Sequence, residues 1–300
     1  MSVIRCNELT KSYGKLNALD HLSFELDENK ITGLIGRNGA GKTTLLKLIT
    51  GYFKPTSGEI QVFSKNPFNN LSVSANTIFV DDNMSFPGSF TLGDILTEVA
   101  NFYQNWNHNL ARGLFDYFSL NPKQRHNRLS KGTKSTFNSI IGLASRCPLT
   151  IFDEPTTGMD SAVRRDFYRA LLKDYIECPR TIVLSSHLLS ELEDILEDIL
   201  LIKDGTKCLF LPVLELKEFA LGIRGNAQAM RSVIEGREII HVEEFAKNGL
   251  YVVTKRKTAQ DQFELARQAG LEVQSVSPDD LCVYLTAKTK GGVDDVFKRS

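Results

Sequence analysis

The sequence is short of the residues that disulfide frameworks, metal clusters and membrane spans require. Its five cysteines are far apart and odd in number, with no C-x-x-C pair and no histidines at metal-ligand spacing, which argues against a disulfide framework and a zinc site. No segment approaches the roughly 18 consecutive apolar residues of a transmembrane helix, and no signal-peptide-like run opens the chain. We therefore expect reduced thiols and a cytoplasmic chain that reaches a membrane only through a partner.

The chain also lacks an excess of either charge. Thirty-six lysines and arginines balance thirty-six aspartates and glutamates. Because nucleic acids and anionic lipids attract an extended basic surface, this balance argues against direct nucleic-acid binding. With 300 residues, 42% of them hydrophobic, the chain is long enough for one large domain and a smaller one.

A glycine-rich segment stands between an apolar run and an amphipathic run. The stretch "GLIGRNGAGKTTLLKLITG", residues 33–51, contains Gly, four residues, Gly-Lys and Thr, which is the P-loop pattern. In a P-loop the backbone N–H groups surround the phosphates, the lysine (Lys42) reaches the β- and γ-phosphates and the hydroxyl (Thr43) ligates Mg²⁺. The candidate ATP-binding residues are Gly36, Arg37, Asn38, Gly39, Ala40, Gly41, Lys42, Thr43 and Thr44.

Two adjacent carboxylates follow the apolar strand predicted in "LTIFDEP". The strand delivers Asp153 and Glu154 to its C-terminal end, where open α/β sheets bind their ligands. An aspartate there can hold Mg²⁺ together with Thr43, and the next carboxylate can polarise the attacking water. We therefore expect Asp153 to be a metal ligand and Glu154 to be the general base.

A second phosphate-compatible helix start lies between these two motifs. In "RLSKGTKSTFNSIIGLA", Leu129–Gly132 come directly before a helical run. Ser130 is equally well explained as an ordinary helix N-cap. Its position between the P-loop and "FDEP" favours a functional interpretation of this segment.

That order resembles the ATP-binding cassette (ABC) family, whose nucleotide-binding domain carries Walker A, signature, Walker B, D-loop and switch-histidine motifs. The resemblance covers roughly residues 2–206. Asp160 in "TTGMDS" matches the D-loop, and His187 in "LSSHLLSELE" matches the switch histidine. Tyr13 in "KSYGK" stands where the family stacks an aromatic ring on adenine, although an exposed turn tyrosine is the alternative.

The resemblance implies catalytic roles for Lys42, Glu154 and His187. It also implies that Ser130, Gly132 and Asp160 contribute to an ATP molecule held between two domains paired head to tail. ATP and Mg²⁺ are the implied ligands.

Two positions depart from the family pattern. The signature reads LSKGT rather than LSGGQ, so Lys131 and Thr133 replace glycine and glutamine. In "IFVDDN", Asp81 or Asp82 stands where the family usually has the Q-loop glutamine. An aspartate ligates Mg²⁺ but does not donate as an amide does, so Asp81 is a further candidate metal ligand.

The implied fold is an α/β P-loop NTPase cassette with a strand-rich, RecA-like lobe and a helical lobe at about residues 84–148. We expect an ABC ATPase domain over residues 1–210 and a small α+β appendage over 211–300 for regulation or dimerisation. Local patterns predict an acidic helix in "LLSELEDILEDI" and, in the appendage, two strands around Asn248-Gly249, a helix in "TAQDQFELARQAG" and two short strands in "LEVQSVSPDDLCVYLTA". The final "KTKGGVDDVFKRS" is predicted to fray.

The resemblance implies an ATP-hydrolysing subunit of a bacterial, export-type, ABC-2-like transporter. Its partners would be integral membrane permease subunits and a second ATPase subunit, identical or paralogous, at the cytoplasmic face of the membrane. Aromatic residues after the Q-loop position would line a docking groove or the core of the lobe: Phe86, Phe90, Phe102, Tyr103 and Trp106.

The alternative function is a soluble ABC ATPase that acts on a ribosome or DNA. It is disfavoured because the chain has one cassette and no sustained heptads. A P-loop kinase, the third class, would not need "LSKG".

Overall fold

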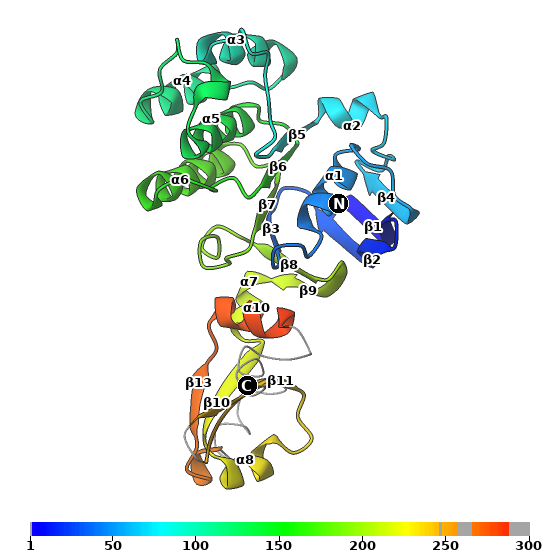
Figure 1. Cartoon of the computed structure of the whole chain (residues 1–300), viewed down its shortest axis with the longest axis vertical. Helices are drawn as coiled ribbons and strands as arrows, with labels where there is room; N and C mark the ends of the chain where they lie inside the picture. The colour runs from blue at the N-terminus through cyan, green and yellow to red at the C-terminus, as the bar shows by residue number, and fades with distance from the viewer. Residues whose placement is uncertain (1, 246–247, 257–265, 288–300) are drawn as a thin grey trace, which may run out of the picture. The chain divides into compact units, whose positions relative to one another are not determined.

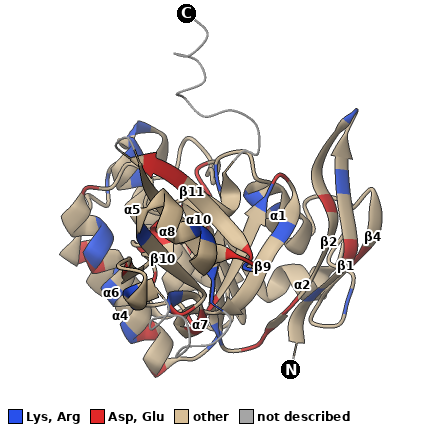
Figure 2. Ribbon diagram, turned by 90° about the horizontal axis from the view of Figure 1, so that it is seen from below, with Lys and Arg blue, Asp and Glu red and all other residues tan. Residues whose placement is uncertain are grey.

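The fold was obtained as a computed structural model that describes residues 2–245, 248–256 and 266–287. Contacts divide the chain into two compact units, unit 1 with residues 1–210 and unit 2 with residues 211–300 (Figure 1). Lysines and arginines are interspersed with aspartates and glutamates on the ribbon (Figure 2). None of the described helices combines the length and the apolar character of a membrane span.

Unit 1 is built around a six-stranded sheet with the strand order β5-β6-β7-β3-β8-β9. The strands are β3 (Ile31–Ile35), β5 (Thr77–Val80), β6 (Leu149–Asp153), β7 (Thr181–Ser186), β8 (Asp198–Lys203) and β9 (Thr206–Pro212). All residues of β3, β6 and β7 are buried, as expected for parallel strands covered on both faces. Pairing is parallel from β5 to β8, so the carboxyl ends of these strands meet at one edge.

An antiparallel sheet and a helix complete the strand-rich part of unit 1. The sheet has the order β2-β1-β4, with β1 Ser2–Tyr13, β2 Leu16–Asp27 and β4 Ser57–Val62. Helix α1 (Lys42–Ile49) contacts β4 and β6 and buries its leucines in a core shared with both sheets. A short helix, α2 (Leu71–Ala75), precedes β5.

Four helices gather on the other side of unit 1 (Figure 1). They are α3 (Leu92–Phe102), α4 (His108–Tyr117), α5 (Lys131–Ala144) and α6 (Ser161–Glu177), with a 3₁₀ turn at His126–Arg128. Helix α3 starts with a capping box in which Thr91 and Asp94 bond reciprocally to each other's backbone N–H. Helix α5 contacts α4, α6, β5 and β6, so its N-terminus is fixed relative to the sheet edge.

Unit 2 contains a four-stranded antiparallel sheet with the order β11-β12-β10-β13. Its elements are α7 (Val213–Lys217), β10 (Ala220–Asn226), α8 (Ala227–Ile234), β11 (Ile239–Phe245), β12 (Gly249–Lys255), β13 (Glu272–Ser275) and α10 (Pro278–Thr286). Counted along the chain from β10, the order is 4-1-3-2, with α8 between the first and second strands, as in the split βαβ motif. Met230 and Val233 of α8 pack with Ile223 and Val252 of the sheet.

The two strands predicted around Asn248-Gly249 are present as β11 and β12. Most of the helix predicted in "TAQDQFELARQAG", and all of the final segment predicted to fray, lie outside the described residues.

Two local predictions are wrong. The acidic segment "LLSELEDILEDI" forms consecutive turns rather than a helix, and its last two residues begin β8. Leu189, Leu192 and Leu196 are buried at helical spacing, but the acidic residues three and four positions apart repel one another, which disfavours a regular helix. The second strand predicted in "LEVQSVSPDDLCVYLTA" is helix α10. Its Ser277 N-cap accepts from the backbone N–H of Asp280, and Pro278 occupies the first turn, so the capping signals outweigh the β-branched residues.

Candidate nucleotide-binding site

The glycine-rich loop runs from the end of β3 to the start of α1, as its pattern predicts. Gly41 is the N-cap of α1 with φ 104°, and a Cβ there would lie 2.5 Å from the carbonyl oxygen of Ala18. A Cβ on Gly36 would lie 2.6 Å from the carbonyl oxygen of Ile202. Both positions therefore need glycine, the first for its backbone conformation and the second for a close backbone approach.

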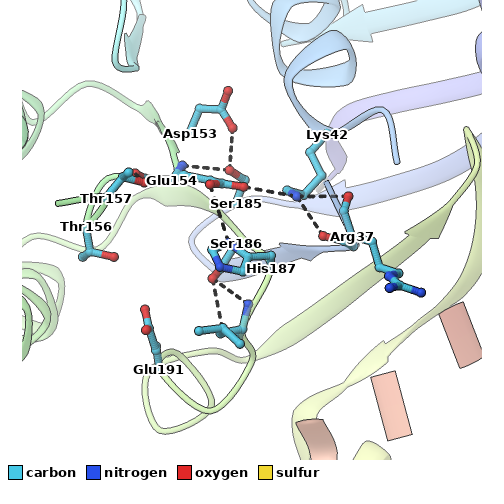
Figure 3. A network of polar contacts seen from close by, with 12 residues as sticks. Arg37, Lys42, Asp153, Glu154, Thr156, Thr157, Ser185, Ser186, His187 and Glu191 are labelled. Carbon is cyan, nitrogen blue, oxygen red and sulfur yellow. Dashed lines mark hydrogen bonds and ion pairs between the residues drawn. The ribbon is translucent and has the colours of Figure 1, made fainter. Parts of the chain in front are cut away.

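A cavity of about 340 Å³ opens beside this loop. It is lined by Leu16, Asn17, Ala18, Asn38, Gly39, Gly41, Lys42, Thr43, Thr44, Glu154 and Asp204. Ala40 is buried within the loop and donates its N–H to the carbonyl of Arg37, whose guanidinium points away from the polar network (Figure 3). Most of the loop residues predicted to bind phosphate therefore line the cavity, whereas Gly36, Arg37 and Ala40 do not.

Lys42 joins Glu154 to the glycine-rich loop in the polar network of Figure 3. Its side chain is 5% exposed, and its Nζ donates to the carbonyl of Gly36 at 2.7 Å. The same Nζ lies 3.2 Å from Oε1 of Glu154. The structure thus brings the P-loop lysine and the predicted general base into direct contact.

Asp153 receives two short hydrogen bonds at the carboxyl end of β6. Thr43 Oγ1 donates to its Oδ2 at 2.6 Å, and Ser185 Oγ donates to its Oδ1 at 2.6 Å. Burial raises the pKa of the Asp153 carboxyl, while the two hydroxyl donors oppose this rise. The hydroxyl and carboxylate predicted to share Mg²⁺ are therefore adjacent, and their hard oxygen donors fit the preference of that ion.

The backbone of Glu154 has a positive φ, which is uncommon for residues other than glycine. Its φ is 48°, and its N–H donates to Ser185 Oγ at 2.9 Å. Oε2 of Glu154 lies 3.6 Å from Nδ1 of His187. Strained backbone of this kind concentrates at functional sites, and here it turns the carboxylate toward both Lys42 and His187.

Ser185 is the residue that the sequence analysis missed. Asp153 and Ser185 are register partners in the parallel pair of β6 and β7, so the serine hydroxyl reaches both the Asp153 carboxylate and the Glu154 N–H. A usable signal existed, because Ser185 directly follows the apolar run "IVL" and lies two residues before His187. Its partner, however, depends on strand register, which the sequence does not reveal.

The predicted signature residues gather in a different cavity, of about 250 Å³. Its lining includes Ser130, Gly132, Gly158 and Asp160. Ser130 caps α5 by accepting from the N–H of Thr133 at 3.3 Å, and a Cβ on Gly132 would lie 2.2 Å from the carbonyl oxygen of Gly158. The signature and D-loop segments therefore pack backbone against backbone.

Tyr13 and Asp81 are among the candidates that lie outside the lining of the P-loop cavity. Tyr13, at the end of β1, is 46% exposed and meets Phe53 edge to face at 6.2 Å. The Asp81 carboxylate accepts from the N–H of Asn83 at 3.0 Å and lines another cavity, of about 740 Å³. The adenine and metal roles of these two residues stay predictions.

An apolar cavity of about 440 Å³ lies in the helical part of unit 1. Four of the five aromatic residues expected to form a groove line it, namely Phe86, Phe90, Phe102 and Tyr103. The fifth, Trp106, instead meets His108 edge to face at 6.5 Å. Phe102 is 83% exposed, so a large aromatic ring is available at this surface.

Comparisons with known proteins point to one family. The family model described as ABC transporter matches residues 19–157. The chain is 29% identical to the bacitracin transport ATP-binding protein BcrA of Bacillus licheniformis, over 97% of this chain and 98% of the relative. It is 30% identical to the uncharacterized ABC transporter ATP-binding protein MJ1023 of Methanocaldococcus jannaschii, over 67% of this chain and 74% of the relative.

A solved structure shows the same fold. The structure of a dimeric ATP-binding cassette in a post-hydrolysis state, bound to ADP and Pi, aligns with a TM-score of 0.61 at 21% identity, covering 70% of this chain and 98% of that one. These similarities lead to the same family as the order of the motifs and the contact of the P-loop with β6. The chain therefore belongs to the ABC transporter family, as an ATP-binding subunit that hydrolyses ATP to drive transport.

Proposed function

We propose that Lys42 and the loop N–H groups hold the phosphates of ATP, that Thr43 and Asp153 hold Mg²⁺, and that Glu154 is the general base. One observation carries this assignment: Thr43 and Asp153, 110 residues apart in the chain, meet at 2.6 Å beside the P-loop cavity. Mg²⁺, when bound, neutralises charge on the phosphate oxygens. We assign to His187, which lies next to Glu154, a hydrogen bond donated to the γ-phosphate.

The proposed reaction uses the contacts between these residues. Glu154 takes a proton from the attacking water, and its strained backbone and the Ser185 hydroxyl fix the direction of its carboxylate. Lys42 is already desolvated and paired with that carboxylate, so phosphate oxygens can replace Glu154 as its ionic partner. Binding of ATP would then release the carboxylate to act on water.

We further propose that ATP is held between two copies, or between this chain and a paralogue, paired head to tail. Support comes from the placement of Ser130, Gly132 and Asp160 around a cavity separate from the P-loop cavity. Each charge-assisted hydrogen bond from Ser130 or from the Gly132 N–H to a phosphate contributes roughly 1.5 to 3 kcal/mol. Association costs roughly 4 to 15 kcal/mol, so several such contacts decide whether the dimer closes, and hydrolysis weakens it again.

The proposed membrane partner binds at the apolar cavity of the helical part. An exposed ring such as that of Phe102, next to an apolar hollow, is typical of a surface that a partner covers. A helix of an integral membrane permease would fit, and its docking would hold the chain at the cytoplasmic face of the membrane.

Unit 2 is proposed to be an accessory domain for regulation or dimerisation. The similarity to the bacitracin transport ATP-binding protein extends over 97% of this chain, so it includes unit 2. Because the name of that relative refers to bacitracin transport, we further propose that the transporter of this chain exports an antibiotic. Truncation before Leu216 tests the role of unit 2: dimerisation that persists without ATP would argue against a dimerisation role.

The test of permease docking is a pull-down from detergent-solubilised native membranes. The Glu154→Gln chain is loaded with ATP, and co-purifying proteins are identified by mass spectrometry. We expect a stoichiometric multi-span membrane protein, and we expect Glu154→Gln combined with Phe102→Asp to lose it while still binding ATP. Recovery of ribosomes, DNA or soluble proteins alone would contradict the proposal.

A further inference from the structure

The two positions that depart from the family pattern contact each other. Lys131 Nζ, in the signature, lies 3.0 Å from Oδ2 of Asp82, in the segment after β5. Lys131 is the first residue of α5, and Asp82 comes two residues after the last residue of β5. Lys131, which replaces the signature glycine, and Asp82, one of the two aspartates at the Q-loop position, are therefore linked by an ion pair within one chain.

Lys131 stands between two residues that line the signature cavity, Ser130 and Gly132. The stem of its side chain packs near the D-loop, since a Cβ on Gly158 would lie 3.2 Å from Cγ of Lys131. The side chain is 59% exposed. Its stem is thus held close to the cavity while its ammonium group stays in solvent, where it can exchange partners.

The segment after β5 does not depend on Lys131 for its position. Lys134 Nζ donates to the carbonyl of Asp82 at 3.3 Å, and Asn138 Nδ2 donates to the carbonyl of Asp81 at 3.4 Å. Lys131, Lys134 and Asn138 lie on one face of α5 because their spacing follows the helical period. Hydrogen bonds from α5 therefore hold the backbone after β5 without Lys131. The ion pair of Lys131 with the Asp82 carboxylate is an extra contact.

We propose that Lys131 is an additional γ-phosphate-binding residue in the composite ATP site and that Asp82 holds its ammonium group until the site closes. This rests on the head-to-tail dimer proposed above, in which Ser130 and Gly132 face the partner's ATP. An exposed ion pair changes an equilibrium by at most about fivefold. A charge-assisted hydrogen bond to phosphate changes it by roughly 10- to 100-fold, so transfer of Lys131 from Asp82 to the phosphate is favourable.

The test compares the signs of two substitutions. In full-length Glu154→Gln protein with ATP, the dimer dissociation constant is measured by analytical ultracentrifugation. Lys131→Met removes the phosphate ligand and is expected to weaken the dimer by about tenfold or more. Asp82→Asn frees Lys131 and is expected to tighten the dimer by up to about fivefold. In the double variant the effect of Asp82→Asn should disappear.

Lys134→Met is the matched control. It removes a positive charge from the same face of α5 and also contacts Asp82, but only at the backbone carbonyl. We expect it to change the dissociation constant by less than about twofold, the range of an exposed polar contact. With ADP in place of ATP, the difference between Lys131→Met and its parent should vanish.

The outcomes separate this inference from the function on which it rests. If Lys131→Met and Asp82→Asn weaken the dimer equally, the pair is structural and Lys131 does not bind phosphate. If Lys134→Met weakens it as much as Lys131→Met, the effect is general electrostatics and the proposal is overturned. If the Glu154→Gln parent forms no ATP-dependent dimer, the head-to-tail assembly itself is wrong, and the role of Lys131 falls with it.

Discussion

Replacing Ser185 with alanine tests the part of the site that joins β6 to β7. The Ser185 side chain is buried, with 1% of the residue exposed, and its hydroxyl donates to Asp153 and accepts from the Glu154 N–H. Losing a hydrogen bond to a charged group costs roughly 1.5 to 3 kcal/mol, and an unsatisfied buried N–H costs roughly 1 to 3 kcal/mol. Because the two losses share one atom, we expect the free energy of unfolding to fall by about 2 to 4 kcal/mol.

The ATPase rate should fall as well. Asp153 and Glu154 both lose their common anchor, and a misplacement of about 1 Å in a reacting group reduces rates by up to about 100-fold. We expect a decrease of roughly 10- to 100-fold, measured as phosphate release, with stability measured by urea denaturation.

Ser139→Ala is the matched control. Ser139 is likewise 1% exposed, but its hydroxyl has no hydrogen-bond partner among the residues that the structure describes. Removing it should leave the unfolding free energy unchanged or slightly higher and the ATPase rate unchanged. The reasoning would be refuted if Ser185→Ala behaved like Ser139→Ala in both assays.

Three further predictions follow from burial and close contacts. Gly132→Ala places a Cβ 2.2 Å from the carbonyl oxygen of Gly158, so we expect a loss of about 1 to 3 kcal/mol in thermal or urea unfolding and a lower ATPase rate. Burial lowers the pKa of His126, so below about pH 6.5 the unfolded chain binds more protons and stability falls, by up to about 1.4 kcal/mol per pH unit. His126→Gln should flatten this slope in urea titrations between pH 7 and 5. Cys6 is buried, and burial raises the pKa of its thiol, so exposed Cys208 should react before Cys6 with a thiol reagent in the folded protein.

Much of the nucleotide site could be predicted because its signals are local. The P-loop glycines and Lys42 lie within one short segment, and Asp153 ends, and Glu154 directly follows, an apolar strand that is fully buried in the sheet. The fold class followed from the same pattern of strands and helices around these motifs.

The contacts that tune the site depend on tertiary structure. The Ser185 bridge arises from the register of β6 with β7, and the pair of Lys131 and Asp82 arises from the packing of α5 against the segment after β5. Neither pairing leaves a periodic signal in the sequence. Helix α10 differs, because its signal is local: Ser277 and Pro278 are typical of a helix start, but the apolar residues that follow also fit a short strand.

The most direct test of the account is the hydrolysis rate of the full-length Glu154→Gln chain, measured as single-turnover phosphate release with ATP binding measured in parallel. Loss of a general base lowers the rate by roughly 10²- to 10⁴-fold, and we expect a decrease in that range with ATP binding retained. Hydrolysis at the unaltered rate would contradict the assignment of Glu154 and, with it, the mechanism built on its contacts with Lys42 and His187.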